Sequence, residues 1–253
     1  MIEVSEAQLL AWITPVVWPF LRALALVWSP PALGTRTVPM RLRVGLAALI
    51  ALAAQAGLPP IEPVPLDSPT AALLVLQQVV IGLSIGFSVR VVFAAVEMAG
   101  EIIGLQMGLN FAGFFDPVSS GSATATSRFL GTTVAWLFIV INGHLLMIAA
   151  LVQSFTSFPV GPEPFEFLRS TMPHRWGAEI FSTGLWIALP LVTMLLFVNL
   201  MLGMISRVAA QINIFAIGFP VTIGVGLLGM LLTLPLMHQP FTMVLERLLA
   251  TFR

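Results

Sequence analysis

The sequence contains no cysteine, no lysine and few charged residues of either sign. The absence of cysteine excludes disulfides, thiolate nucleophiles and cysteine metal ligands. All eleven basic residues are arginine and eleven acids balance them, so nothing suggests a surface for nucleic acid or another polyanion. Charged residues make up 9% of the chain and hydrophobic residues 58%, whereas about 25% of a soluble domain is charged. This composition indicates an integral membrane protein.

Motifs for nucleotide, metal or hydrolytic chemistry are also scarce. The sequence has no HExxH pattern, no phosphate-binding glycine-rich loop and no cluster of histidines and carboxylates at ligand spacing. GLSIG at 82–86 matches the nucleophile pattern G-x-S-x-G, but it lies inside a continuous apolar segment and not between a strand and a helix. We interpret Gly82 and Gly86 as a packing face of small residues. We therefore expect no enzyme activity, no cofactor and no metal.

Apolar segments approach the roughly 20 residues that a membrane span needs. About six are visible, at residues 9–28, 42–58, 71–96, 129–156, 180–206 and 212–237. They predict an all-α membrane protein, a single domain over residues 1–253, with some segments paired as hairpins. The arginine-rich residues 29–43 should lie in the cytoplasm, whereas 157–179 should lie on the outer side only if all six segments cross.

Several charged side chains lie within or beside these segments. Each would cost about 2.5–3.5 kcal/mol at the centre of a bilayer, so each should face protein or water. We predict such buried contacts for Arg22, Arg90, Glu97, Glu101 and Arg207. Arg90, Glu97 and Glu101 share one helical face, which suits either an ion or proton pathway or a contact with a neighbouring subunit. The contact is favoured, because the acids cluster at one segment boundary.

The most informative stretch is residues 97–128, EMAGEIIGLQMGLNFAGFFDPVSSGSATATSR. Gly100, Gly104 and Gly108 recur every fourth residue, which predicts a helical face where a second backbone comes close. From Gly113 onward the helical pattern fails, so a broken helix should lead into a loop. At membrane depth such backbone is tolerated only where it is buried in protein or lines a cavity. This stretch should therefore meet protein or a pore.

Phenylalanines in this broken segment are poorly explained as ordinary core. Phe111, Phe114 and Phe115 stand beside glycines, and Pro117 ends the segment. Hydrophobic constrictions can close a pore by excluding water. We predict that residues 110–117 form a plug, with a static turn as the alternative.

Five blocks of sequence, taken in order, resemble one family, the flagellar biosynthetic protein FliR. They are WPFLRALAL at 18–26, RTVPMRLRVGLA at 36–47, AGEIIGLQMGLNFAGFFDP at 99–117, NGHLLMI at 142–148 and ALPLVTMLLFVNLMLGMISRVAAQINIFAIGFPVTIGVGL at 188–227. Injectisome export proteins share the R-x-A-x-Q-x-N-x-F pattern of residues 207–215. The FDP block and the IGFP run look more like the flagellar branch. Residues 118–128 match no block of the family.

The resemblance implies a subunit of the type III protein export gate in the bacterial inner membrane, at the flagellar basal body. FliP-like and FliQ-like subunits, with a FlhB-like switch subunit, would join it in a helical channel for unfolded flagellar proteins. The gate or plug positions are then Gln106, Met107, Asn110, Phe111, Phe114, Phe115, Asp116 and Pro117. An injectisome export gate is one alternative. A small-molecule or ion transporter is another, although no inverted repeat is visible.

Overall fold

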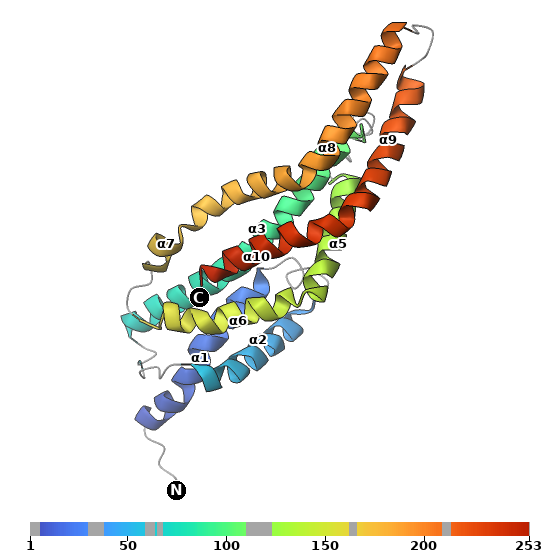
Figure 1. The fold of residues 1–253 in the computed structure, drawn as a ribbon. Coiled ribbons are helices and arrows are strands. Elements are labelled where there is room, and N and C mark those ends of the chain that lie inside the picture. The colour runs from blue at the N-terminus through green and yellow to red at the C-terminus, as the bar shows by residue number, and fades with distance from the viewer. Residues whose placement is uncertain are drawn as a thin grey trace. The chain divides into compact units, whose positions relative to one another are not determined.

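The computed structural model describes residues 6–29, 38–58, 64, 68–109, 123–161, 166–208 and 214–252. Within these ranges every regular element is a helix, as Figure 1 shows, which confirms the all-α membrane fold class. The α-helices are α1 (Glu6–Trp28), α2 (Met40–Ala54), α3 (Pro69–Gln106), α5 (Ala125–Val140), α6 (Gly143–Ser157), α7 (Glu166–Thr171), α8 (Trp176–Val208), α9 (Ile214–Thr233) and α10 (His238–Ala250). Short 3₁₀ helices cover Gln55–Gly57, Pro173–Arg175 and Leu234–Met237.

Fewer helices can cross a membrane than the sequence predicts. In the described part of the chain, three stretches are long and apolar enough, Pro69–Gln106, Glu166–Val208 and Ala216–Ala250. The pair α5 and α6 makes a fourth if it counts as one broken span. The difference from about six lies at the N-terminal end, since the apolar helix Trp12–Trp28 and the 15-residue α2 fall short of a span.

A turn interrupts the segment that the sequence predicts as continuous from 129 to 156. Asn142 has a φ of 57°, in the left-handed region, and its N–H donates to the carbonyl of Ile139 at 3.0 Å. Asparagine adopts this conformation more readily than most residues. The Asn-Gly pair at 142–143 is a turn signal that outweighs the apolar run around it.

The chain divides into two compact units, which are described separately. Unit 1 comprises Met1–Arg90, Ile139–Trp176 and Leu245–Arg253, and unit 2 comprises Val91–Phe138 and Gly177–Val244. The prediction of a single domain stays a prediction.

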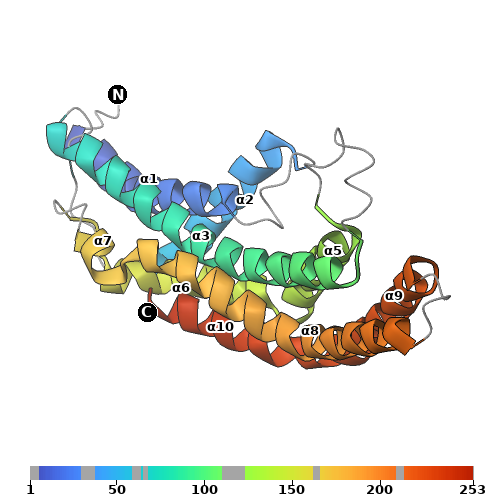
Figure 2. The ribbon, with the colours of Figure 1, turned by 90° about the horizontal axis from the view of Figure 1, so that it is seen from above.

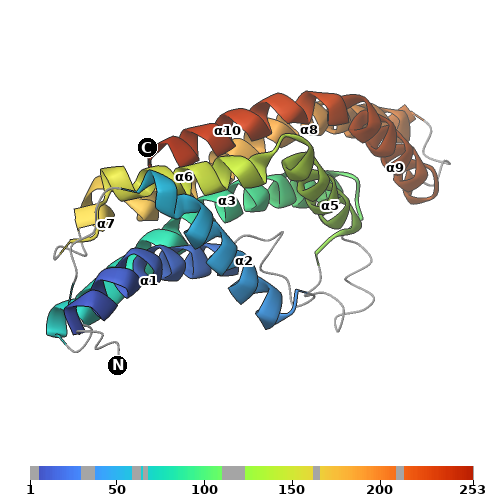
Figure 3. The ribbon, with the colours of Figure 1, turned by 90° about the horizontal axis from the view of Figure 1, so that it is seen from below.

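In unit 1, α1 packs closely along the first part of α3, as Figures 2 and 3 show. A Cβ added to Gly82 would overlap the backbone carbonyl oxygen of Arg22, and one on Gly86 would overlap the Cβ of Ser29. GLSIG therefore forms a helix-packing face in this structure. Trp18 of α1 lies fully buried beside Leu74 of α3 in the same region.

Gly82→Ala should destabilise the protein by about 1–3 kcal/mol, because overpacking a close contact forces the backbone apart. Gly203 of α8 is the matched control, since a Cβ there meets nothing within 4 Å. Gly203→Ala should be neutral or stabilising, because alanine is the better helix former. The unfolding midpoint of each purified protein in detergent is the measurement. Equal midpoints for the two variants would contradict the close α1–α3 contact.

Each unit contains a cluster of packed aromatic side chains. In unit 1, Phe167 of α7 packs against Phe158 at 4.9 Å and Phe252 at 5.7 Å between ring centroids. In unit 2, Phe93 of α3 meets Phe138 of α5 at 5.6 Å and Phe241 of α10 at 6.0 Å. The edge-to-face geometry of both Phe93 pairs is the favoured arrangement for aromatic rings.

Helices α8 and α9 lie side by side as a hairpin within unit 2 (Figure 1). Gly229 of α9 lies against α8, since a Cβ there would overlap Leu191 and Met194 of α8. Gly184 of α8 similarly accommodates the side chain of Met98 from α3. These glycines place α8 between α3 and α9.

Candidate functional site

The end of α3 is a glycine-terminated helix stop. Gly108 has a φ of 81° and follows the last helical residue, Gln106, by two positions. The N–H of Leu109 donates to the carbonyl of Gly104 at 3.0 Å, and that of Gly108 to Leu105 at 3.1 Å. These two bonds define the Schellman motif, in which glycine takes the left-handed position after a helix. The four-residue spacing places Gly108 on the packing face, but the helix ends before it, so that prediction is wrong for Gly108.

Gly100 and Gly104 face the start of α5. A Cβ on Gly100 would come within 2.5 Å of the Cα of Ser127. A Cβ on Gly104 would overlap the hydroxyl oxygen of Thr126. Both glycines are buried, and there is no room for a methyl group at either. Gly100 meets the backbone of α5, whereas Gly104 meets threonine side chains.

Hydroxyl groups from α5 bond to backbone carbonyls of α3 at this contact. Thr126 Oγ1 donates to the carbonyl of Gly100 at 2.8 Å, and Ser127 Oγ donates to the carbonyl of Glu97 at 3.0 Å. Thr126 and Ser127 are both buried. Two hydrogen bonds one residue apart therefore fix the register of α5 on α3.

Thr124 caps α5 and joins it to an acid of α3. The N–H of Ser127 donates to Thr124 Oγ1 at 3.2 Å, which is the bond expected of an N-cap threonine. The N–H of Thr124 donates to Glu101 Oε1 at 3.0 Å. Glu101 thus meets a backbone donor of its own chain, whereas the sequence favours a contact with a neighbouring subunit.

α9 also contacts the C-terminal end of α3. Met107 is buried, and its carbonyl accepts a hydrogen bond from Thr222 Oγ1 at 3.2 Å. Gly226, one turn further along α9, leaves space for the Met107 side chain, whose Cγ would lie 2.6 Å from an added Cβ. A cavity of about 600 Å³ lies beside this contact. Its walls are apolar and come from Met107, Leu109, Ala125, Thr126, Phe129, Ile223, Leu227, Met230, Leu231 and Leu234.

We call this arrangement the α3–α5 joint, made of Gly100, Glu101, Gly104, Met107, Thr124, Thr126 and Ser127 with Thr222 and Gly226 of α9. It anchors the chain on both sides of residues 110–122. The predicted positions Asn110, Phe111, Phe114, Phe115, Asp116 and Pro117 lie outside the described residues. Gln106, half-buried, is the last residue of α3.

Sequence reasoning missed most of the α5 side of the joint. α5 begins at Ala125, four residues before the predicted apolar segment, inside the stretch that matches no block of the family. A signal was present, because a threonine just before a helical run is a common N-cap. Thr222 and Gly226 carry no comparable signal, since their role depends on which helix lies opposite.

Arg22 is the one predicted charge that the described part of the chain buries completely. Its Nε donates to Gln78 Oε1 at 2.8 Å, Nη1 to Ser154 Oγ at 2.9 Å and Nη2 to the carbonyl of Phe158 at 3.0 Å. The guanidinium carbon lies 3.7 Å from the centre of the Phe155 ring. These four partners are neutral, so hydrogen bonds and a cation–π contact compensate the buried charge.

Gln77 extends this network to the turn after α6. Gln78 Nε2 donates to Gln77 Oε1 at 2.9 Å, and Gln77 Nε2 donates to the carbonyl of Pro159 at 3.3 Å. The N–H of Gly161 also donates to Gln77 Oε1, at 3.3 Å. Two adjacent glutamines in an apolar segment are the signal that sequence reasoning overlooked.

The other predicted charges are not buried by the chain itself. Arg90, Glu97 and Arg207 are exposed, and Glu101 is half-buried. The predicted burial of Arg90, Glu97 and Arg207 stays a prediction for the assembled protein. In the described residues, no group of three or more His, Asp or Glu side chains could hold a metal ion.

Known proteins match the chain along nearly its whole length. The family model described as bacterial export proteins, family 1, matches residues 13–248. Flagellar biosynthetic protein FliR of Escherichia coli K12 is 44% identical over 95% of this chain and 92% of its own length. The FliR proteins of Pectobacterium carotovorum and of Buchnera aphidicola from Acyrthosiphon pisum are 40% and 32% identical, over 95% and 98% of this chain and 92% and 96% of their own lengths.

Proposed function

Because this chain belongs to the FliR family of bacterial export proteins, we propose that it is a subunit of the flagellar type III export gate. In this proposal it lies in the inner membrane at the flagellar basal body. FliP-like and FliQ-like subunits, with a FlhB-like switch subunit, join it to form the channel through which unfolded flagellar proteins cross. The observation that carries the proposal is the match, over 95% of the chain, to proteins named for flagellar biosynthesis.

Exposed surfaces in unit 2 support a partner other than lipid. In the most apolar 18-residue stretch of Glu166–Val208, only 17% is buried within the chain. The corresponding share for Pro69–Gln106 is 67%. Asn199 and Arg207 of α8 are exposed together with large apolar side chains such as Phe197. A polar or charged group is costly in hydrocarbon, so this mixed surface favours neighbouring chains or a water-filled channel.

The α3–α5 joint supports a gate at residues 110–117. Gly108 turns the chain out of α3 in a conformation that glycine adopts at little cost. Thr124, bonded to Glu101, fixes the point where the chain enters α5. We place the plug between these two anchors, where Phe111, Phe114 and Phe115 would close the channel by excluding water.

Deleting residues 111–115 should make cells with assembled complexes leak small solutes, because the apolar side chains that exclude water are gone. Deletion of residues 118–122 removes the same length without a phenylalanine and is the matched control. It should leave the membrane tight. Solute permeability is measured in cells in which complex assembly has been verified. An assembled 111–115 deletion as tight as wild type would refute the plug.

Ser84→Ala should leave motility and export unchanged, because Ser84 lies between two packing glycines on α3 and we propose no catalytic role for it. Motility in soft agar is the measurement. Loss of motility with an intact complex would instead support a hydrolase.

Purification of the tagged chain from its membrane tests the proposed function as a whole. An export-gate subunit should bring FliP-like and FliQ-like chains with it. A small-molecule transporter should be recovered alone or as a homo-oligomer. Mass spectrometry of the purified complex distinguishes the two, and recovery of the chain by itself from mild detergent would contradict the proposal.

A further inference from the structure

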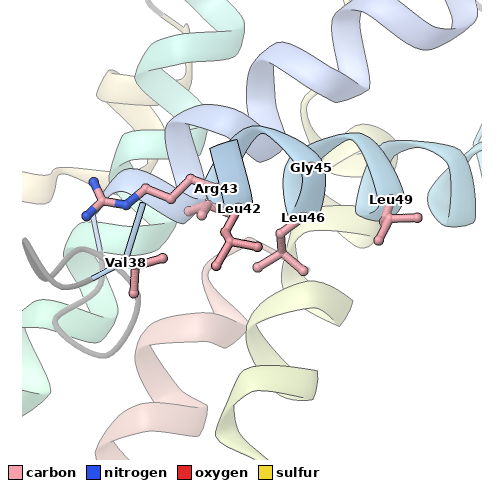
Figure 4. Close-up of a pocket in the computed structure, with 7 residues that line it drawn as sticks. Val38, Leu42, Arg43, Gly45, Leu46 and Leu49 are labelled. Carbon is pink, nitrogen blue, oxygen red and sulfur yellow. The ribbon is translucent and has the colours of Figure 1, made fainter. Parts of the chain in front are cut away.

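A groove of about 440 Å³ in unit 1 runs along α2. Figure 4 shows Val38, Leu42, Leu46 and Leu49 in a row along one side of α2, with the guanidinium group of Arg43 at the end near Val38. The spacing from Leu42 to Leu49 corresponds to about 10 Å along the helix axis. An apolar groove with a cation at one end is complementary to a phospholipid, because the acyl chain is apolar and the phosphate is anionic.

Arg43 lines the groove at its cationic end, and Arg41 precedes it by two residues on α2. Successive helical residues are about 100° apart, so Arg41 and Arg43 flank Leu42 on opposite sides. The first turn of α2 contains no acid. Arg43 is 8% exposed, and its guanidinium carbon lies 5.5 Å from the centre of the Trp28 ring. The planar guanidinium group of arginine suits bidentate binding of a phosphate.

The first turn of α2 adds backbone N–H groups that can donate hydrogen bonds to a phosphate. The N-cap residue is Pro39, which makes no side-chain capping hydrogen bond. The N–H groups of Leu42 and Arg43 donate to the carbonyl of Pro39. Those of Met40 and Arg41 come earlier in the helix and have no acceptor within it. The positive end of the helix dipole therefore coincides with the two arginines.

The apolar part of the groove is exposed on the surface of this chain. Leu42 is 63% exposed and Leu49 67% exposed. A free phosphate would use the arginines and leave this row uncovered. An acyl chain attached to a phosphate covers both parts.

We propose that this groove binds one anionic phospholipid. One acyl chain lies along Val38, Leu42, Leu46 and Leu49, and the phosphate lies at Arg41, Arg43 and the first N–H groups of α2. The site is independent of the proposed channel, because all its residues belong to unit 1 and none to the α3–α5 joint.

Native mass spectrometry of the full chain in detergent tests the proposal, with phosphatidylglycerol and phosphatidylcholine of identical acyl chains as probes. Wild type should prefer phosphatidylglycerol by about tenfold or more, and Arg43→Gln should weaken that binding about fivefold, given the usual contribution of one arginine near an anionic headgroup. Arg169→Gln changes an exposed arginine of α7 and should leave the preference intact.

Leu46→Trp should fill the groove and abolish lipid binding, whereas Leu52→Trp is the control. Leu52 lies on the same helix, is 55% exposed and does not line the groove. Equal phosphatidylglycerol binding by these two variants would overturn the proposal, and this pair decides the matter if Arg43→Gln fails to fold. The absence of a preference for phosphatidylglycerol in wild type would also overturn the proposal. A preference that survives Arg43→Gln would do the same. Inorganic phosphate that binds wild type and Leu46→Trp alike would identify a free-anion site and also overturn it.

Discussion

Gly104→Leu should abolish accumulation of the assembled complex. A side chain at this position would overlap the hydroxyl oxygen of Thr126, and Thr124 Oγ1 is 3.2 Å from the first atom added. The start of α5 would have to leave α3, which breaks the bonds from Thr126 to Gly100 and from Thr124 to Glu101. Loss of both anchors would misplace the chain on either side of residues 110–122. Blue-native electrophoresis of membrane extracts measures the complex.

A paired variant makes this expectation specific to the α3–α5 joint. Gly104→Ala alone should reduce assembly, and adding Thr126→Ala should restore part of it, because the overlapping hydroxyl is removed. Gly177→Leu is the control, since a Cβ there meets nothing within 4 Å. A normal complex from Gly104→Leu, or no rescue by Thr126→Ala, would contradict the close contact.

Arg22→Met should lower the free energy of unfolding by about 3 kcal/mol or more, because it leaves buried acceptors unpaired at roughly 1–3 kcal/mol each. Those acceptors are Gln78 Oε1, Ser154 Oγ and the carbonyl of Phe158. Methionine has a similar length, so the loss of bonds outweighs any cavity. The unfolding midpoint of the purified protein in detergent, followed by its helical circular dichroism, measures the effect.

Arg22→Lys should fall between wild type and Arg22→Met. A lysine ammonium is a compact charge, whereas the guanidinium fork reaches three acceptors at once. Arg169→Met is the control at an exposed position and should change stability by less than about 0.5 kcal/mol. Arg22→Met with the stability of wild type would show that the Arg22 network is dispensable.

The fold class followed from composition, because a helix is the simplest way to satisfy the backbone within lipid. Each predicted apolar segment contains a helix, and low charge alone indicated the membrane. The number of spans was less predictable. Hydropathy treats a short apolar helix such as α2 like a span, and it does not register a break made by one asparagine in the left-handed conformation, as at Asn142.

The spacing of residues in the sequence could not predict every contact of the candidate site. Gly100, Gly104 and Gly108 are equivalent as a pattern, yet two contact α5 and the third ends α3. What separates them is the position of the helix end, which depends on bonds made by Gly108 and Leu109. For Arg22 the desolvation cost required partners, but only the fold could show that Gln78 and Ser154, 56 and 132 residues away in sequence, would supply them.

Photo-crosslinking to a stalled substrate tests most directly the claim that unfolded proteins pass this chain. A benzoyl-phenylalanine replaces Phe114 in cells that export a flagellar protein fused to a tightly folded tail, which stalls in the channel. The same probe at Leu52, exposed on α2, is the control. The proposed function predicts a covalent adduct with the substrate from Phe114 and none from Leu52. No adduct from Phe114 in an assembled complex that holds stalled substrate, or equal adducts from both positions, would contradict it.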